Sequence, residues 1–143
     1  MNVHIDETAP ISDADRRTIR DGLDAFNRRH MPAGAPEPVE LALRDEAGRV
    51  CGGLLGETRW HWLEIGTLWV TEEHRGKGHG RALLHRAEEI AHERGCRMAV
   101  LDTTAFQALD FYYAQGYIPF GEVPDYPPGS RTVFLCKALV ADG

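Results

Sequence analysis

Hydrophobic and polar positions divide the chain into alternating helix and strand patterns. Ile19, Leu23 and Phe26 form one amphipathic stripe, which predicts a helix capped by Ser12 and ending near Arg29. Two further helices are predicted, from the end of a glycine-rich loop at residue 80 to Arg94 and over residues 106–115. Apolar and alternating runs predict strands at residues 3–5, 39–43, 50–55, 60–70, 98–101, 117–123 and 132–139.

This order of elements predicts a mixed α/β (α+β) fold with a mainly antiparallel sheet and helices on both faces. Residues 39–55 are expected to form an antiparallel hairpin around the turn at residues 45–48. The run at residues 98–101 is wholly apolar and follows a helix, so it predicts a buried strand parallel to residues 60–70. Gly66 within that longer strand predicts a bulge or a close backbone approach.

Length and charge narrow the class of protein. The 143 residues predict one domain over residues 1–143, and 43% hydrophobic residues supply a core. The net charge of −6 argues against a nucleic-acid partner and is compatible with a cationic substrate. Three cysteines without paired spacing indicate reduced thiols in a cytoplasmic protein. We expect no signal peptide and no membrane partner, because no apolar run is long enough.

The stretch that carries the chemistry is the glycine-rich loop between the 60–70 strand and the next helix. Gly76, Gly78 and Gly80 alternate with cationic side chains just before the helical pattern begins. A helix N-terminus offers unpaired N–H groups and partial positive charge, so this layout predicts a phosphate site. A Walker loop is excluded because Lys77 is followed by Gly78 instead of Ser or Thr. The glycine spacing also fails the dinucleotide-binding pattern.

Two motifs resemble the GNAT superfamily of N-acetyltransferases. Arg75-x-x-Gly78-x-Gly80 is similar to the acyl-coenzyme A (CoA) loop of that family, and residues 108–117 are similar to its A-x-x-[LF]-Y-x-x-x-G-[FY] signature. The resemblance implies a six- to seven-stranded sheet with splayed central strands. It implies transfer of an acetyl group from acetyl-CoA to a primary amine by direct attack in a ternary complex. A non-catalytic acyl-CoA-binding module of the same fold, or an enzyme that uses another acyl group, is the alternative.

The resemblance also implies a set of residues that hold the cosubstrate. Main-chain groups of Leu68 and Val70 would pair with the pantetheine arm, and amides from Arg75 to Arg81 would hold the pyrophosphate. Thr104 would replace an asparagine that the family often carries after the parallel strand. The full implied set is Leu68, Trp69, Val70, Arg75, Gly76, Lys77, Gly78, His79, Gly80, Arg81, Thr104 and Phe111.

Two residues are candidates for proton transfer. Tyr112 matches the tyrosine that the family places beside the CoA sulfur, which makes it the candidate general acid. Glu64 is the candidate general base, at about the offset used by the histone-acetylating branch. Glu64 could instead pair with a cross-strand arginine or only attract a cationic amine while a water chain removes the proton. His61 is a weaker candidate for the same role.

The acceptor pocket is expected from residues 31–38, the start of the 60–70 strand and residues 125–130. Trp60, Trp62 and Tyr126 would supply aromatic surface, and Glu64 and Asp125 negative charge, for an amine-bearing small molecule or peptide. The histidine spacing predicts no metal site. The resemblance further implies that two subunits can pair as a homodimer through the C-terminal strands.

Overall fold

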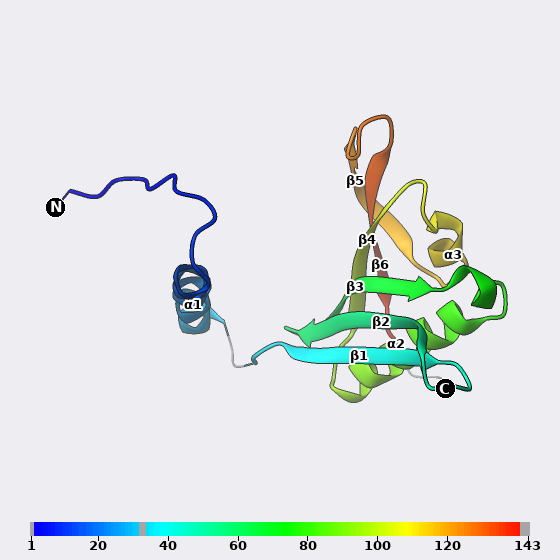
Figure 1. The fold of residues 1–143 in the computed structure, drawn as a ribbon. Helices are drawn as coiled ribbons and strands as arrows, with labels where there is room; N and C mark the ends of the chain where they lie inside the picture. The colour runs from blue at the N-terminus through cyan, green and yellow to red at the C-terminus, as the bar shows by residue number, and fades with distance from the viewer. Residues whose placement is uncertain (1, 32–33, 141–143) are drawn as a thin grey trace. The chain divides into compact units, whose positions relative to one another are not determined.

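A computed structural model describes residues 2–31 and 34–140 (Figure 1). The chain divides into two compact units, residues 1–34 and residues 35–143, and each is described by itself. The single domain expected over residues 1–143 stays a prediction.

The first unit contains one helix, α1 (Asp13–His30). Ser12 caps it as predicted, because its Oγ accepts a hydrogen bond from the amide of Asp15 at 3.0 Å. The strand predicted at residues 3–5 is wrong, since these residues carry no strand structure. Two alternating apolar residues are too short a pattern to fix a strand without a neighbouring partner.

The second unit is built on one six-stranded sheet in the order β1-β2-β3-β4-β6-β5. Its β3 and β4 strands are parallel and every other neighbouring pair is antiparallel, so the predicted parallel pairing is confirmed. The strands are β1 (Glu37–Arg44), β2 (Val50–Arg59), β3 (Trp62–Val70), β4 (Met98–Thr104), β5 (Ile118–Pro124) and β6 (Arg131–Ala138). The helices are a 3-10 turn η1 (Glu72–His74), α2 (His79–Glu93) and α3 (Leu109–Ala114).

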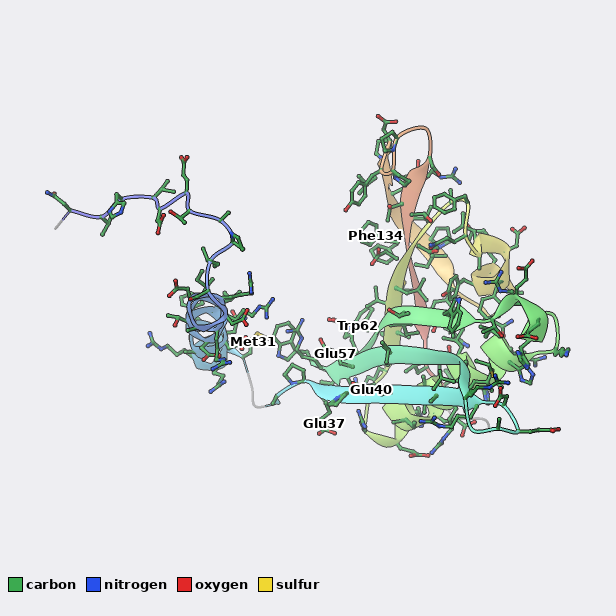
Figure 2. The ribbon with its side chains drawn as sticks, in the orientation of Figure 1. Met31, Glu37, Glu40, Glu57, Trp62 and Phe134 are labelled. Carbon is green, nitrogen blue, oxygen red and sulfur yellow. The ribbon has the colours of Figure 1, made fainter. Side chains whose placement is uncertain are left out.

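The core lies between one face of this sheet and the apolar side of α2. Leu84, Ala87 and Ala91 of α2 are almost fully buried with sheet residues such as Leu63 and Leu135. The apolar spacing of i, i+3 and i+7 in α2 produces this contact and fixes the helix against the strands. Successive side chains of a strand point to opposite faces, so the remaining sheet side chains, among them Glu57 and Phe134, lie on the other face (Figure 2).

The central strands part towards their C-terminal ends. Pairing between β3 and β4 runs from Trp62 opposite Met98 to Ile65 opposite Leu101 and stops there. Gly66 is skipped in the register between β2 and β3, which confirms the predicted bulge. One edge of β3 beyond Gly66 therefore has no strand partner among the residues that the structure describes.

Several element boundaries differ from the pattern-based expectation. The strands predicted at residues 50–55 and 60–70 are joined more tightly, because β2 runs to Arg59 and only Trp60 and His61 form the turn. Both turn residues have positive φ, 53° and 66°, as a type I′ two-residue hairpin turn requires. Helix α3 begins at Leu109 instead of residue 106. Among the described residues, no helix has the length and apolar character needed to cross a membrane.

Candidate active site

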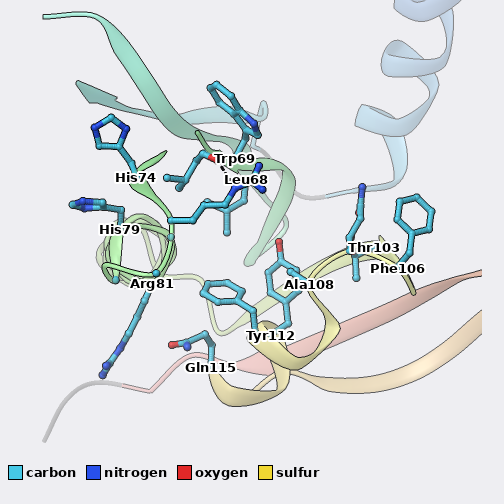
Figure 3. A pocket seen from close by; sticks show the side chains of 17 residues that line it. Leu68, Trp69, His74, His79, Arg81, Thr103, Phe106, Ala108, Tyr112 and Gln115 are labelled. Atoms are coloured by element: carbon cyan, nitrogen blue, oxygen red, sulfur yellow. Dashed lines mark hydrogen bonds between the residues drawn. The ribbon is translucent and has the colours of Figure 1, made fainter. Parts of the chain in front are cut away.

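A cavity of about 740 Å³ lies where the second half of β3, the start of α2 and α3 meet (Figure 3). Its wall includes most of the residues that the sequence predicts for cosubstrate binding. Those on the wall are Leu68, Trp69, Val70, Arg75, Gly76, Gly78, His79, Gly80, Arg81 and Phe111. The predicted general acid Tyr112 lines the same cavity.

The glycine-rich loop leaves the N-terminus of α2 open to this cavity. Gly76 and Gly78 adopt left-handed φ values of 74° and 84°, a conformation that other residues reach only with strain. The amide of Ala82 makes a 3.0 Å hydrogen bond to the carbonyl of Gly78, so the amides before it lie ahead of the helical ladder. Among the described residues no side chain caps this end, and its first turn holds no acid. The arrangement suits an anion.

The edge of β3 that faces the gap presents backbone groups. The amide of Thr71 donates to the carbonyl of Cys51, so alternation turns the main-chain groups of Leu68 and Val70 away from β2. The carbonyl of Val70 is not free, because Arg75 Nε donates to it at 2.8 Å. This bond ties the loop back to the strand. Leu68 remains the better candidate for pairing with a peptide-like ligand.

Tyr112 rises from α3 with its hydroxyl directed towards the end of β3 that carries Leu68 and Trp69 (Figure 3). The side chain is 8% exposed, and its ring packs edge-on against Phe111 and Tyr117. Burial raises the pKa of the Tyr112 phenol above its usual value of 10. The hydroxyl has no hydrogen-bond partner among the described residues, so it is a protonated donor that faces the cavity.

Two predicted cosubstrate residues do not line the cavity. Lys77 is not among the wall residues, and Thr104 is replaced on the wall by its neighbour Thr103. Successive strand residues alternate in direction, and Thr103 is the one on the α2 side, where it is buried. The sequence reasoning missed six wall residues, namely His74, Thr103, Phe106, Gln107, Ala108 and Gln115. Phe106, Ala108 and Gln115 lie close to Tyr112 in the sequence, and this proximity could have indicated these three residues.

Glu64 lies on the opposite face of the sheet from Tyr112. It alternates with the buried residues Leu63 and Ile65, and its carboxylate is 3.4 Å from the guanidinium of Arg59 on β2. The ion pair with a cross-strand arginine, which the sequence left open, is therefore present. Glu64 and Tyr112 can act on one ligand only through the gap between β3 and β4.

The polar groups of the loop at residues 125–130 form hydrogen bonds within the loop or with the strand that follows it. Asp125 Oδ1 accepts from the amide of Gly129 at 2.9 Å, and Thr132 Oγ1 donates to the carbonyl of Tyr126. None of these residues lines the cavity. Trp60 is covered by the guanidinium of Arg59, 4.2 Å from its ring centre. Within residues 2–31 and 34–140, no three histidine, cysteine or acidic side chains gather as metal ligands.

Comparison with known proteins agrees with this arrangement. Residues 6–117 match the model of the acetyltransferase (GNAT) family, so the chain belongs to that family. It is 39% identical to the blasticidin-S acetyltransferase of Streptomyces morookaense over 78% of this chain and 85% of the relative.

Solved structures share the fold. An acetyltransferase from Bacillus cereus superposes with a TM-score of 0.85 at 34% identity, over 96% of this chain and 98% of that one. A Bacillus anthracis protein provisionally named a streptothricin acetyltransferase, solved in complex with acetyl coenzyme A, has a TM-score of 0.65 at 17% identity. That match spans 75% of this chain and 65% of the other.

Proposed function

We propose that this protein transfers an acetyl group from acetyl-CoA to the primary amine of an acceptor. The observation that carries the proposal is the content of one cavity: an open helix N-terminus, an unpaired strand edge and a protonated phenol. These match the three parts of an acyl-CoA, which are its diphosphate, its amide-containing arm and its thioester. Membership of the acetyltransferase family supports the same ligand, and so does the acetyl-CoA bound to the B. anthracis relative.

The amides that follow Gly78 would hold the diphosphate, with Arg75 and Arg81 adding positive charge on the cavity wall. Leu68 would pair with the amide-containing arm through its main chain. A backbone N–H on this edge can also stabilise the negative charge that develops on the thioester oxygen. Fixing the arm in this way would set the reactive carbonyl carbon at the opening between β3 and β4.

The reaction is an addition and elimination at that carbon. The lone pair of a neutral amine forms the new C–N bond, and the C–S bond breaks with its electron pair on sulfur. Tyr112 would give its phenolic proton to the departing thiolate, and the attacking nitrogen loses one proton in return. Glu64 would receive that proton, directly or through water, from the other side of the sheet.

Two measurements on the purified protein test the proposal. Calorimetric titration with CoA should show saturable binding. Added salt should weaken this binding, because charged groups hold the diphosphate. Release of free thiol from acetyl-CoA should then depend on added amine. Binding of CoA without amine-dependent thiol release would instead identify a non-catalytic acyl-CoA-binding module. Absence of CoA binding would reject both functions.

A further inference from the structure

A second hollow, of about 420 Å³, lies across the sheet from the cosubstrate cavity. Residues of β2, β3, β4 and β6 line it, including the side chains of Glu57, Glu64, Asp102 and Phe134. We call it the acidic hollow. The acceptor pocket predicted from residues 31–38, the start of the 60–70 strand and residues 125–130 shares Glu64 with this hollow, but the prediction did not include Glu57, Asp102 or Phe134.

Strand register brings these side chains onto one face. Glu57 is directly opposite Glu64 across β2 and β3, and Asp102 is opposite Phe134 across β4 and β6. Opposite residues in adjacent strands share a face, so three carboxylates and one aromatic ring surround the same space. The aromatic surface of Phe134 continues onto Phe120, and the two ring centres are 6.2 Å apart. The hollow therefore has an anionic side and an aromatic side, and Figure 2 labels one residue of each, Glu57 and Phe134.

The hollow borders the gap between β3 and β4, where the reaction is proposed. Pairing between β3 and β4 ends at Ile65 and Leu101, and the next residues, Gly66 and Asp102, belong to the wall of the hollow. Thr103, the residue after Asp102, belongs to the wall of the cosubstrate cavity. The two spaces thus border the same gap between the strands from opposite faces of the sheet.

The charges in the hollow are not balanced. Glu64 is paired with Arg59, but neither the carboxylate of Glu57 nor that of Asp102 has a hydrogen bond or ion pair with any residue that the structure describes. Three carboxylates and one guanidinium leave a formal charge of −2. A reacting amine cannot supply the missing positive charge, because its nitrogen must be neutral when it attacks.

We infer that the acceptor is a small amine that carries at least one further cationic group, separate from the nitrogen that is acetylated. Glu57 and Asp102 hold that second cation, and Phe134 contacts it or the chain beside it through its ring face. The inference rests on the proposed acetyl transfer and specifies its substrate class. The volume of the hollow is that of a small-molecule site.

A matched series of acceptors tests the inference. 1,5-Diaminopentane, 5-aminopentan-1-ol and 5-aminopentanoic acid share an amine and a five-carbon chain but end in a cation, a neutral group and an anion. The diamine should show a kcat/KM about tenfold above the amino alcohol, beyond the factor of two that its second amine supplies. The amino acid should be the poorest acceptor, and salt should narrow the differences. Equal rates across the series would overturn the inference.

Variants assign the preference to the hollow. Glu57→Gln and Asp102→Asn should each lower the ratio of diamine to amino alcohol rates, and the double variant should remove most of it. Glu40→Gln is the matched control, because this exposed carboxylate is on β1 outside the hollow and should leave the ratio unchanged. An unchanged ratio in the double variant, with CoA affinity retained as proof of folding, would reject the assignment.

A binding measurement separates this inference from the proposed function. Calorimetric titration of 1,5-diaminopentane into the CoA-loaded protein should show binding that the double variant loses, whether or not any amine is acetylated. Binding without thiol release would retain the hollow as a cation site and reject catalysis. Thiol release from all amines, without selective diamine binding, would retain catalysis and reject the hollow.

Discussion

Tyr117 donates a 2.8 Å hydrogen bond to Glu88, a carboxylate that is only 8% exposed in the middle of α2. The other oxygen of Glu88 accepts from Lys137 on β6 at 2.9 Å. Glu88 thus joins the helix behind the phosphate loop to the last strand and to the ring that packs edge-on against Tyr112. The bond connects α2 to the residue that follows α3, the helix that carries Tyr112.

Replacing Glu88 by alanine should destabilise the protein strongly. The change leaves the ammonium of Lys137 and the hydroxyl of Tyr117 in a largely buried place without their partner. We expect the free energy of unfolding to fall by about 2–4 kcal/mol, measured by urea denaturation. Glu89→Ala is the control, because Glu89 is half-exposed and its ion pairs are on the surface, so the loss there should stay within about 1 kcal/mol. Equal losses in the two variants would contradict the buried role of Glu88.

The free energy of unfolding should decline at alkaline pH, because the phenols of Tyr117 and Tyr112 are buried. Burial, followed by the nearby charge of Glu88, raises the pKa of Tyr117 well above 10, and burial also raises that of Tyr112. The native state therefore retains protons that the unfolded chain releases near pH 10. The contribution is complete below pH 10 and is lost as the pH rises towards the folded pKa, at about 1.4 kcal/mol per pH unit for Tyr117, with a further loss from Tyr112 in the same direction. Urea unfolding from pH 9 to 11 should show this slope. Tyr117→Phe should remove the part of the slope that comes from the Tyr117 proton.

The local part of the site could be read from the sequence. Alternating glycines before an amphipathic pattern predict the open N-terminus of α2, since both features depend on residues within one turn of each other. Tyr112 instead depends on the family resemblance, which places a tyrosine at its position before Gly116. The strand patterns also predicted the parallel pair and the bulge at Gly66.

The acidic hollow could not be read, because it depends on register between distant segments. Glu57 stands opposite Glu64 only because β2 extends through residue 59 and the chain turns within two residues. Propensity argues against Trp60 and His61 at positive φ, so the tight turn was missed. Glu88 and Lys137, 49 positions apart, meet for the same reason of tertiary packing.

The conformation of Gly78 permits a prediction that separates strain from binding. Gly78→Ala introduces a Cβ at φ 84°, which should cost about 1–2 kcal/mol of stability, and the new methyl group would project into open space at the loop. We expect CoA affinity to fall about tenfold or more, because the diphosphate loses close approach to the amides. Gly48→Ala is the control, because Gly48 has a similar φ of 81° in the β1–β2 turn. It should lose similar stability and bind CoA normally, as calorimetry can show.

Tyr112→Phe removes the proposed donor while keeping the ring. The phenylalanine ring fills the same buried space, so folding and CoA affinity should be retained. We expect kcat to fall about 100-fold with KM for acetyl-CoA little changed, because the thiolate leaves without a proton. Tyr113→Phe is the matched control, since the neighbouring ring is 42% exposed and does not line the cavity. Full activity of the Tyr112 variant across the pH range would exclude it as the acid.

Glu64→Gln tests the base from the other side of the sheet. The amide keeps the shape of the side chain, but it cannot accept a proton and releases Arg59 from its ion pair. If Glu64 takes the proton from the attacking nitrogen, kcat should fall about 100-fold and the acidic limb of the pH–rate profile should disappear.

Arg59→Gln is the companion variant, because it frees Glu64 from the same ion pair without removing the carboxylate. Its activity should be retained, since the proposed base is still present. A profile in which Glu64→Gln only raises KM for cationic amines, with kcat and the acidic limb preserved, would assign Glu64 to attracting the acceptor. Removal of the proton would then fall to a water chain through the gap between β3 and β4.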